Sequence, residues 1–529
     1  MGNKTMSNAL QRLQKAVEVT IAAGYQLNKE AFDFLCMIAT TEDPVELVSK
    51  ALERINTLKD KPIFIGRKIL EEFVEKPEPA KEEVLQPVLE LIKPPLAESE
   101  QNKQIFGGKQ TFRPYAKEVE ADINIIDDPG SRLSSSGNME DYLTYFRDRF
   151  KRIEKLLRQR IDVRGAASVI DALKAAPNTK LKVIGMITEK REVKQKIILT
   201  IEDLQASATV LVPQNASTDL INKARTLLLD QVVCLSVTKT RGELLIVDDI
   251  ILPDIAPKTQ NKAQFPVYAV LTSDMHVGSV KFQKEAFNRF VLWLNGKYGN
   301  KEMREIASHV KYVLIAGDIV DGIGVYPNQV KELAIKDIYG QYKLAAEFIE
   351  QIPDYIEVVI IPGNHDASRK ALPQPPISDA FLEPLRESRS VYSVGNPCTI
   401  SLHKVEVLLY HGRSLDDVVS TVPGMDYTHP EKAMTLLLQS RHLAPVYGGK
   451  NPLSPETKDY LVIERVPDVF HAGHIHTVSY INYRGVLVVN SGCWQEQTDY
   501  MRRLGLVPTT SLVPVVNLQT FDVKVLSFR

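Results

Sequence analysis

The sequence predicts a multidomain protein with a helical N-terminal domain, a β-barrel and a larger α/β domain, in that order. Three observations support this prediction. The chain has 529 residues, which is too long for one ordinary core because domains usually hold about 100–200 residues. Residues 178–256 contain three apolar strands, a short helix and two further strands. From residue 266 to residue 529, apolar strands alternate with helical patterns, as in α/β domains.

Residues 1–74 read as a small helical domain, because apolar residues recur every three or four positions in ALQRLQKAVEVTIAAG. Asp43 followed by Pro44 is typical of a helix start, with a capping side chain and proline in the first turn. Residues 75–138 are rich in glutamate and proline and predict a flexible acidic linker. The N-terminal domain has no cluster of ligand-type residues, so we expect it to bind a partner rather than to catalyse.

Residues 139–177 predict a basic helical segment that begins with MEDYLTYFRDRFKRIEKLLRQR. Its positive residues are Arg147, Arg149, Lys151, Arg152, Lys155, Arg158 and Arg160. Such a run usually forms a solvated face of a helix, and contact with phosphates or with an acidic partner is the alternative.

Residues 178–256 have the strand and helix order of an OB-fold β-barrel. Barrels of this kind often bind single-stranded nucleic acid by stacking its bases on aromatic side chains. This segment has no Phe, Tyr or Trp. We therefore predict that the barrel docks another protein rather than a nucleic-acid strand.

Composition narrows the class of protein further. The formal net charge of −1 excludes a strongly basic nucleic-acid coat, but it leaves room for a local basic groove. Four cysteines without a C-x-x-C pair predict free thiols in a reducing cytosol. No apolar run reaches the roughly 18 residues of a membrane-spanning helix, and the N-terminal residues lack a signal-peptide pattern. We expect a soluble cytoplasmic protein with no membrane partner.

All ten histidines lie between His276 and His476, within the α/β domain. Half of them belong to polar clusters that follow apolar strands. The clusters are Leu271-Thr-Ser-Asp-Met-His276, Ala316-Gly-Asp-Ile-Val-Asp321, Pro362-Gly-Asn-His-Asp366, Leu409-Tyr-His-Gly412 and Gly473-His-Ile-His476. Because α/β sheets bind ligands beyond the carboxyl ends of their strands, we expect these clusters to meet at one site.

The clusters contain the side chains that a pair of divalent cations requires. Two cations about 3.5–4 Å apart need a bridging carboxylate flanked by other ligands, and Asp318 is the natural bridge. Alternation along an extended chain end would place Asp274 and His276 on one side, and the same spacing pairs His474 with His476.

The third cluster adds two side chains with different expected roles. Asn364 can offer an amide oxygen, whereas His365 follows it and points elsewhere, so His365 is a better acid than ligand. Glycines would let the backbone turn sharply and approach the cations; these are Gly317, Gly363, Gly412 and Gly473.

The motifs D-x-H, GD-x-x-D, GNH-D, a later H and GH-x-H closely resemble those of the calcineurin-like metallophosphoesterase superfamily, over residues 267–477. The resemblance implies that residues 266–529 form a two-sheet β-sandwich flanked by helices. It also implies two metal ions, one held by Asp274, His276, Asp318 and His476, the other by Asp318, Asn364, His411 and His474.

The same resemblance implies roles for residues around the metals. His365 would stabilise the transition state or protonate the leaving oxygen, with Asp366 orienting its ring, while a metal-bridging hydroxide attacks phosphorus in line. Asp321 can bond a ligand histidine. Arg413 either meets a phosphate or is an ordinary surface arginine, and His471 either orients a ligand or is simply buried. Several imidazole ligands favour manganese, zinc or iron over magnesium, and the superfamily's nucleases suggest Mn²⁺.

Longer motifs, among them LTSDMHVGS, AGDIVDGIGVYPNQ, IPGNHDASR and NSGCWQEQT, resemble the small subunits of archaeal D-family DNA polymerases, over residues 139–529. This resemblance implies a 3′–5′ exonuclease for single-stranded or mispaired DNA ends, a large subunit with the polymerase site, and attachment to a sliding clamp. Related eukaryotic polymerase subunits have lost metal ligands, whereas every ligand position here keeps a competent residue. We therefore expect an active nuclease. The alternatives are a catalytically idle docking subunit and a phosphomonoesterase or cyclic-nucleotide phosphodiesterase.

Overall fold

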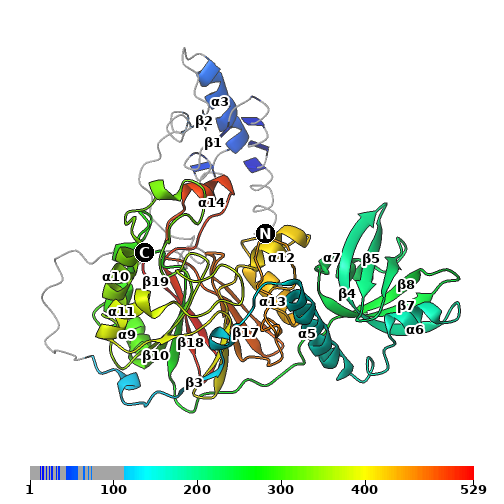
Figure 1. Cartoon of the computed structure of the whole chain (residues 1–529). Coiled ribbons are helices and arrows are strands. Elements are labelled where there is room, and N and C mark those ends of the chain that lie inside the picture. Colours follow the sequence, from blue (N-terminus) through cyan, green and yellow to red (C-terminus); the bar gives the residue numbers. More distant parts are fainter. Residues whose placement is uncertain are drawn as a thin grey trace, which may run out of the picture. The chain divides into compact units, whose positions relative to one another are not determined.

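The computed structural model describes residues 112–529 without interruption and scattered residues between 12 and 73 (Figure 1). Contacts divide the chain into two units, Met1–Pro95 and Leu96–Arg529, and each unit is described by itself. Residues 75–111, which belong to the predicted linker, lie outside the described residues.

The first unit contains a helix that begins where the sequence predicts. Helix α3 spans Pro44–Asn56, and Asp43 Oδ1 accepts a hydrogen bond from the Val45 backbone N–H at 2.9 Å. Its buried face contributes Leu47, Val48, Ala51, Leu52 and Ile55 to a small core. The structure adds two short strands that the sequence does not predict, β1 (Gln26–Leu27) and β2 (Phe64–Ile65), which pair in parallel.

In the second unit, a closed barrel has the strand and helix order that the sequence predicts. Its elements are β4 (Lys180–Val193), β5 (Lys196–Glu202), β6 (Ser207–Val212), α7 (Thr218–Thr226), β7 (Val232–Lys239) and β8 (Leu245–Ile251). The strands follow the order β4-β5-β6-β8-β7, and β4 pairs with β7 to close the barrel. Alternate side chains of β5 are buried, which gives the barrel its apolar interior.

The basic segment forms α5 (Met139–Arg158) and α6 (Val169–Lys174). A capping box starts α5: Asn138 Oδ1 accepts from Asp141 N, and Asp141 Oδ2 accepts from Asn138 N. Neither interpretation of the charge run accounts for Arg149, which is fully buried and pairs with Asp459 at 2.7 Å. The remaining positive side chains are exposed or half-buried.

Two six-stranded sheets form the body that carries the polar clusters (Figure 1). The first has the order β12-β11-β10-β9-β18-β19, with β9 (Tyr268–Thr272), β10 (Val310–Ala316), β11 (Glu357–Ile361), β12 (Tyr392–Ser393), β18 (Leu512–Asn517) and β19 (Val523–Ser527). The second has the order β16-β17-β15-β14-β13-β3, with β3 (Ile123–Asp127), β13 (Cys398–Leu402), β14 (Val405–Leu409), β15 (Val469–Ala472), β16 (Ser479–Tyr483) and β17 (Val486–Asn490).

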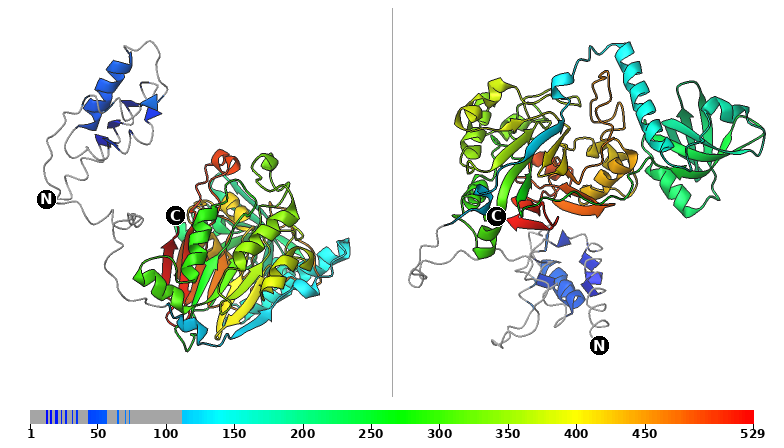
Figure 2. Two further views of the ribbon diagram at one scale, coloured as in Figure 1. Left: turned by 90° about the vertical axis from the view of Figure 1, so that its left-hand side faces the viewer. Right: turned by 90° about the horizontal axis from the view of Figure 1, so that it is seen from below.

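Three apolar cores hold four layers together (Figure 2). Side chains of the first sheet pack against α8 (Lys284–Leu294), α9 (Lys301–His309), α10 (Ile338–Ile349) and α11 (Asp379–Ser388). The second sheet packs against α12 (Leu415–Thr421) and α13 (Pro430–Ser440). A third core lies between the sheets. Strand β10 shows why both faces are apolar: Val313 and Ile315 enter the helix-side core, while Tyr312 and Leu314 enter the core between the sheets.

The last part of the predicted linker is wrong, because residues 112–138 are folded onto this body. Strand β3 pairs antiparallel with β13, which places Ile123 opposite Leu402. The Glu456 carboxylate then accepts hydrogen bonds from the backbone N–H groups of Ser134 and Ser135 at 2.7 and 3.0 Å. The acidic, proline-rich composition ends before this stretch, and the apolar INII segment gives β3 side chains to pack.

Three further expectations can be compared with the structure. Cys234, Cys398 and Cys493 are buried free thiols, as expected, while Cys36 lies outside the described residues. Among the residues that the structure describes, no helix combines the length and the apolar character needed to cross a bilayer.

Candidate metal centre

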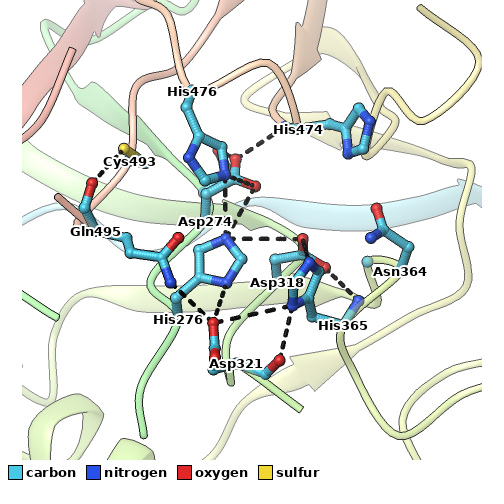
Figure 3. Close-up of polar contacts among 12 residues, drawn as sticks. Asp274, His276, Asp318, Asp321, Asn364, His365, His474, His476, Cys493 and Gln495 are labelled. Atoms are coloured by element: carbon cyan, nitrogen blue, oxygen red, sulfur yellow. Dashed lines mark hydrogen bonds and ion pairs between the residues drawn. The ribbon is translucent and has the colours of Figure 1, made fainter. Parts of the chain in front are cut away.

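The five polar clusters meet at one end of the two sheets. Strands β9, β10 and β11 are parallel neighbours, and β14 and β15 are parallel neighbours in the other sheet. Their carboxyl ends therefore open on the same side, and the loops that follow bring the clusters together (Figure 3).

Side chains from these loops approach closely enough to share metal ions. Three groups have ligand atoms within 4.8 Å of one another: Asp274 with His276 and His476, His276 with Asp318 and His365, and Asp318 with His411 and His474. Asn364 joins the third group, because its Oδ1 lies 2.9 Å from His411 Nε2. The structure thus brings every predicted ligand into one site.

Asp318 occupies the centre of this arrangement. Its Oδ2 lies 3.4 Å from His411 Nε2 and 3.9 Å from both His276 Nε2 and His365 Nε2. Its Oδ1 accepts a hydrogen bond from the His365 backbone N–H at 2.7 Å. A buried carboxylate between two sets of ligands has the position that a bridging ligand needs.

The backbone conformation of the ligands differs from the extended chain that the sequence argument assumes. Asp274, His276, Asp318, His474 and His476 have φ values between 52° and 68°. This left-handed region typically costs a non-glycine residue about 1–3 kcal/mol and is enriched at functional sites. The D-x-H and H-x-H pairs therefore converge through sharp turns, not through alternation along a strand.

Glycines leave no free space beside these turns. A Cβ on Gly363 would overlap Asp318 Oδ1, and one on Gly473 would lie 2.5 Å from Asp274 Oδ2. Gly317, at φ 88°, would place its Cβ 2.6 Å from His411 Nδ1. The close approach predicted for these glycines is therefore to ligand side chains.

Hydrogen bonds at the outer nitrogens orient the imidazoles. His276 Nδ1 donates to Asp321 Oδ1 at 3.1 Å, and His411 Nδ1 donates to the Ala316 carbonyl at 2.8 Å. Both rings therefore present Nε2 to the site. His474 is reversed: its Nε2 donates to Asp416 Oδ2 at 3.1 Å, which leaves Nδ1 for a metal. The sequence reasoning missed Asp416, although it lies in the SLDDV stretch that directly follows the His411 cluster.

The predicted link between Asp366 and His365 is wrong. His365 Nδ1 donates instead to the backbone carbonyl of Asp321 at 2.7 Å. The Asp366 carboxylate accepts hydrogen bonds from the backbone N–H groups of Gly363 and Ile319 and from the Tyr342 hydroxyl. Asp366 therefore holds the GNHD turn against the loop after β10, and it does not touch the His365 ring.

His471 connects to the site through a buried chain of hydroxyls. Its Nε2 lies 3.1 Å from Ser491 Oγ, which lies 2.7 Å from Ser273 Oγ. Ser273 Oγ in turn donates to Asp274 Oδ2. Of its two predicted roles, the structure favours support of a ligand. Ser273 and Ser491 are additions that no motif in the sequence distinguishes from ordinary turn residues.

The site concentrates ionised groups away from water. Burial alone would raise the pKa of Asp318, but the surrounding imidazoles of His411 and His365 hold it well below its ordinary value. Burial would likewise lower the pKa of His276, yet the neighbouring Asp274 and Asp321 carboxylates raise it to about 10. The carboxylates therefore stay charged and attract cations.

His365 behaves differently from the other site histidines. Burial lowers the pKa of His365 to about 4. Its imidazole is therefore neutral at pH 7 in the free protein, with Nδ1 donating and Nε2 directed toward Asp318.

The residues present fit a pair of divalent cations. Asp274 Oδ1 is buried and accepts no hydrogen bond, although His476 Nε2 lies 3.2 Å away. The Nε2 atoms of His276 and His476 face each other at 3.1 Å. Nitrogen pairs and unpaired oxygens that point into one buried space are the donor set that imidazole-binding transition metals prefer.

Two cationic side chains lie at the Asn364 side of the centre. Lys370 Nζ donates to the Asn364 carbonyl at 2.5 Å, and Arg413 Nη1 donates to the Lys370 carbonyl at 3.2 Å. Arg413 is half-buried and Lys370 is exposed. The predicted phosphate contact of Arg413 thus gains a neighbour, Lys370, that the sequence reasoning did not select.

Comparison with known proteins places the chain in a family. A family model for the second, or B, component of DNA polymerases alpha and epsilon matches residues 269–481. A DNA polymerase II small subunit from Archaeoglobus fulgidus is 37% identical over 504 residues, which cover 94% of each chain. The protein of that name from Methanothermobacter thermautotrophicus is 35% identical and covers 90% of this chain and 92% of its own.

Similarity to solved structures is much weaker. An archaeal phosphodiesterase aligns with 49% of this chain and 99% of its own at 12% identity, but its TM-score of 0.25 is too low to support an argument. The sequence relatives decide the assignment, because they align over nearly the whole length of both chains. The chain belongs to the DNA polymerase II small subunit family.

Proposed function

We propose that the chain is the small subunit of a heterodimeric archaeal replicative DNA polymerase and carries its 3′–5′ exonuclease. The substrate would be a single-stranded or mispaired DNA end. The relatives are named as small subunits, which supports a large catalytic subunit as the partner. A sliding clamp is a further expected partner.

The observation that carries this proposal is the complete ligand set around Asp318. Residues able to bind a cation occupy every predicted ligand position, and the ligand atoms lie within 4.8 Å of one another in overlapping groups. Two bound divalent ions, most simply Mn²⁺, would supply a Lewis acid and an activated water for phosphodiester hydrolysis. Mg²⁺, Zn²⁺ and Fe²⁺ are the other candidates, and Mg²⁺ fits an imidazole-rich set least.

The chain's own residues would position the scissile phosphate and assist its departure. His365, held by the Asp321 carbonyl at 2.7 Å, is placed to bond a phosphate oxygen. Because its pKa is about 4 in the free protein, it can donate a proton only after an anionic phosphate raises that pKa. Arg413 and Lys370 would neutralise charge on the phosphates that flank the cleaved bond.

The barrel supports the docking half of the proposal. Its strand order, with β6 and β8 paired in parallel and β4 closing on β7, is that of an OB-fold. No aromatic ring occurs between residues 178 and 256, so the stacking surface of strand-binding OB-folds is missing. We therefore assign the barrel to contact with the large subunit.

Cleavage of labelled single-stranded DNA tests the enzymatic proposal. With Mn²⁺, the full-length chain should shorten 5′-labelled DNA one nucleotide at a time. Asp318→Asn should lose bound metal and show no cleavage, because the central carboxylate is removed. His429→Ala, which changes an exposed histidine, serves as the matched control and should cleave normally.

Two results would contradict the proposal. Absence of shortening by the wild-type chain, both alone and with its large subunit, would indicate an idle docking subunit. Release of phosphate from p-nitrophenyl phosphate without action on DNA would indicate a phosphomonoesterase.

A further inference from the structure

Two tyrosines from distant parts of the sequence form a stacked pair beside the metal centre. Tyr326 lies in the loop after β10, and Tyr500 lies on α14 (Asp499–Arg503). Their ring centroids are 5.4 Å apart with an interplanar angle of 28°. The Tyr326 ring is also 6.2 Å from the ring of His365. The pair thus extends outward from the residue assigned to the scissile phosphate.

Packing of the protein interior does not explain this pair. Helix α14 contributes no buried residue, and Tyr500 is 46% exposed. Leu504 and Val507, which follow the helix, are 56% and 77% exposed. A surface helix normally buries its apolar face. The aromatic and apolar side chains of α14 are instead available to a ligand.

One carboxylate holds the two tyrosine-bearing segments together. Glu332 Oε2 accepts a hydrogen bond from the Tyr326 hydroxyl at 2.9 Å, and Glu332 Oε1 accepts one from the Asp499 backbone N–H at 3.0 Å. Thr498 Oγ1 caps α14 by accepting from Met501 N at 3.2 Å. The rings are therefore positioned before any ligand arrives, which reduces the entropy lost on binding.

Positive charge accompanies the rings. Arg502 and Arg503 are exposed on α14, and Arg502 pairs with Asp499 at 2.8 Å. Within residues 112–529, the Arg503 side chain has no hydrogen bond or ion pair. Aromatic rings for bases together with cations for the backbone are the two components of sites that bind single-stranded nucleic acid.

We propose that Tyr326 and Tyr500 form a nucleobase-stacking platform that holds the end of an unpaired DNA strand at the metal centre. This inference rests on the proposed exonuclease function and adds the feature that selects its substrate. A base inside a duplex is already stacked between its neighbours, so a paired end must fray before it can occupy the platform. An unpaired or mispaired end occupies it directly.

Binding without metal tests the platform independently of catalysis. Fluorescence anisotropy of a labelled oligodeoxythymidine with the full-length chain in EDTA gives the affinity. Tyr500→Leu should weaken binding about 5- to 100-fold, the range that stacking of one base contributes. Tyr500→Phe should bind like wild type because it keeps the ring. Tyr339→Leu is the matched control, since Tyr339 is 57% exposed and stacks on Phe381 instead.

A second oligonucleotide with an abasic 3′-terminal nucleotide identifies the group that is recognised. Wild type should bind it more weakly than the intact strand, whereas Tyr500→Leu should bind both equally. Equal preference for the intact strand in wild type and Tyr500→Leu would overturn the platform. So would normal DNA binding by Tyr500→Leu together with lost binding of the large subunit, because the tyrosines would then be a protein-docking surface.

The two proposals can fail separately. If the abasic preference depends on Tyr500 but wild type with Mn²⁺ does not cleave DNA, the platform stands and the exonuclease does not. If wild type cleaves DNA and Tyr500→Leu keeps the abasic preference, the exonuclease stands and the platform does not.

Discussion

Asp318 shows at the residue scale how the site is assembled. Imidazole nitrogens from three other loop positions lie within 4 Å of one carboxylate oxygen, although the residues are widely separated in sequence. Five predicted ligands adopt left-handed backbone conformations. The fold must stabilise these conformations, since an isolated loop would relax to a commoner one.

His365 can be separated from the metal ligands by substitution. His365→Ala should keep both metal ions and slow DNA hydrolysis by about 10²- to 10⁴-fold, the usual contribution of a proton-transferring side chain. Its backbone N–H, which bonds Asp318 Oδ1, survives the change. Metal content by mass spectrometry and single-turnover rates provide the measurements. Loss of an ion would show instead that His365 is a ligand, as its place in the second ligand group allows.

The lack of space at Gly363 leads to a second residue-scale prediction. In Gly363→Ala, the new Cβ would overlap Asp318 Oδ1 and lie 2.5 Å from Asp318 N. We expect Asp318 to shift and Mn²⁺ affinity to fall by about 10-fold or more, as titration calorimetry would measure. Gly165→Ala is the control, because nothing lies within 4 Å of its Cβ. Unchanged affinity in Gly363→Ala would mean that the Asp318 position is not essential.

Sequence patterns identified ligands better than they identified the residues that orient them. The ligands stand in short motifs with fixed spacing, so Asp274 and Asp318 could be selected directly. The partner of an imidazole depends on which way the ring turns in three dimensions. Asp366 is adjacent to His365 in sequence, yet the carbonyl of Asp321 holds that ring. Asp416 could not be selected, because nothing in the sequence shows that His474 is reversed.

At the scale of elements, α5 is attached to the sheet body through a buried polar cluster. Arg149 bonds Asp459 Oδ2 at 2.7 Å, the Pro445 carbonyl at 2.6 Å and the Tyr145 hydroxyl at 3.1 Å. His442 Nε2 donates to the same Asp459 oxygen at 2.8 Å. A buried charge of this kind is expensive to leave unpaired, so the cluster fixes the register of α5.

This cluster should make the protein sensitive to acid. Burial and the nearby Arg149 charge lower the pKa of His442 to about 4, and its Nδ1 already accepts from Ala444 N. The unfolded chain binds that proton near pH 6.5, so the free energy of unfolding should fall as pH decreases from about 6.5 to 4, by up to about 3 kcal/mol.

Urea unfolding across this pH range measures the effect. The fall should be smaller in His442→Asn, which has no proton to gain, and unchanged in His429→Asn, where the histidine is exposed. An equal pH dependence in wild type and His442→Asn would assign the acid sensitivity to other groups.

Elements with a single strong pattern could be predicted, and elements that depend on distant partners could not. The barrel strands alternate apolar and polar residues, and their order follows from the sequence alone. Strand β3 has only five residues and gains stability by pairing with β13, more than 270 positions later. No local property of the segment shows that such a partner exists.

At the scale of the whole molecule, the division into two units leads to a truncation experiment. A chain that begins at residue 96 should keep the metal affinity and the melting temperature of the larger unit, because the contacts within Leu96–Arg529 are retained. A chain that begins at residue 139 should melt at a lower temperature, since it lacks β3 and the bonds to Glu456. Calorimetry of the two chains would test this, and equal melting temperatures would contradict it.

The position of β3 also changes how the barrel relates to the metal centre. The polypeptide leaves the second sheet at β3, forms the barrel, and returns to the first sheet at β9. In topological terms the barrel is an insertion within the catalytic body, not a preceding module, and two covalent crossings anchor it. Its freedom to swivel is limited accordingly. A large subunit that grips the barrel thereby acquires a defined bearing on the nuclease, which suits the transfer of a growing strand between two active sites.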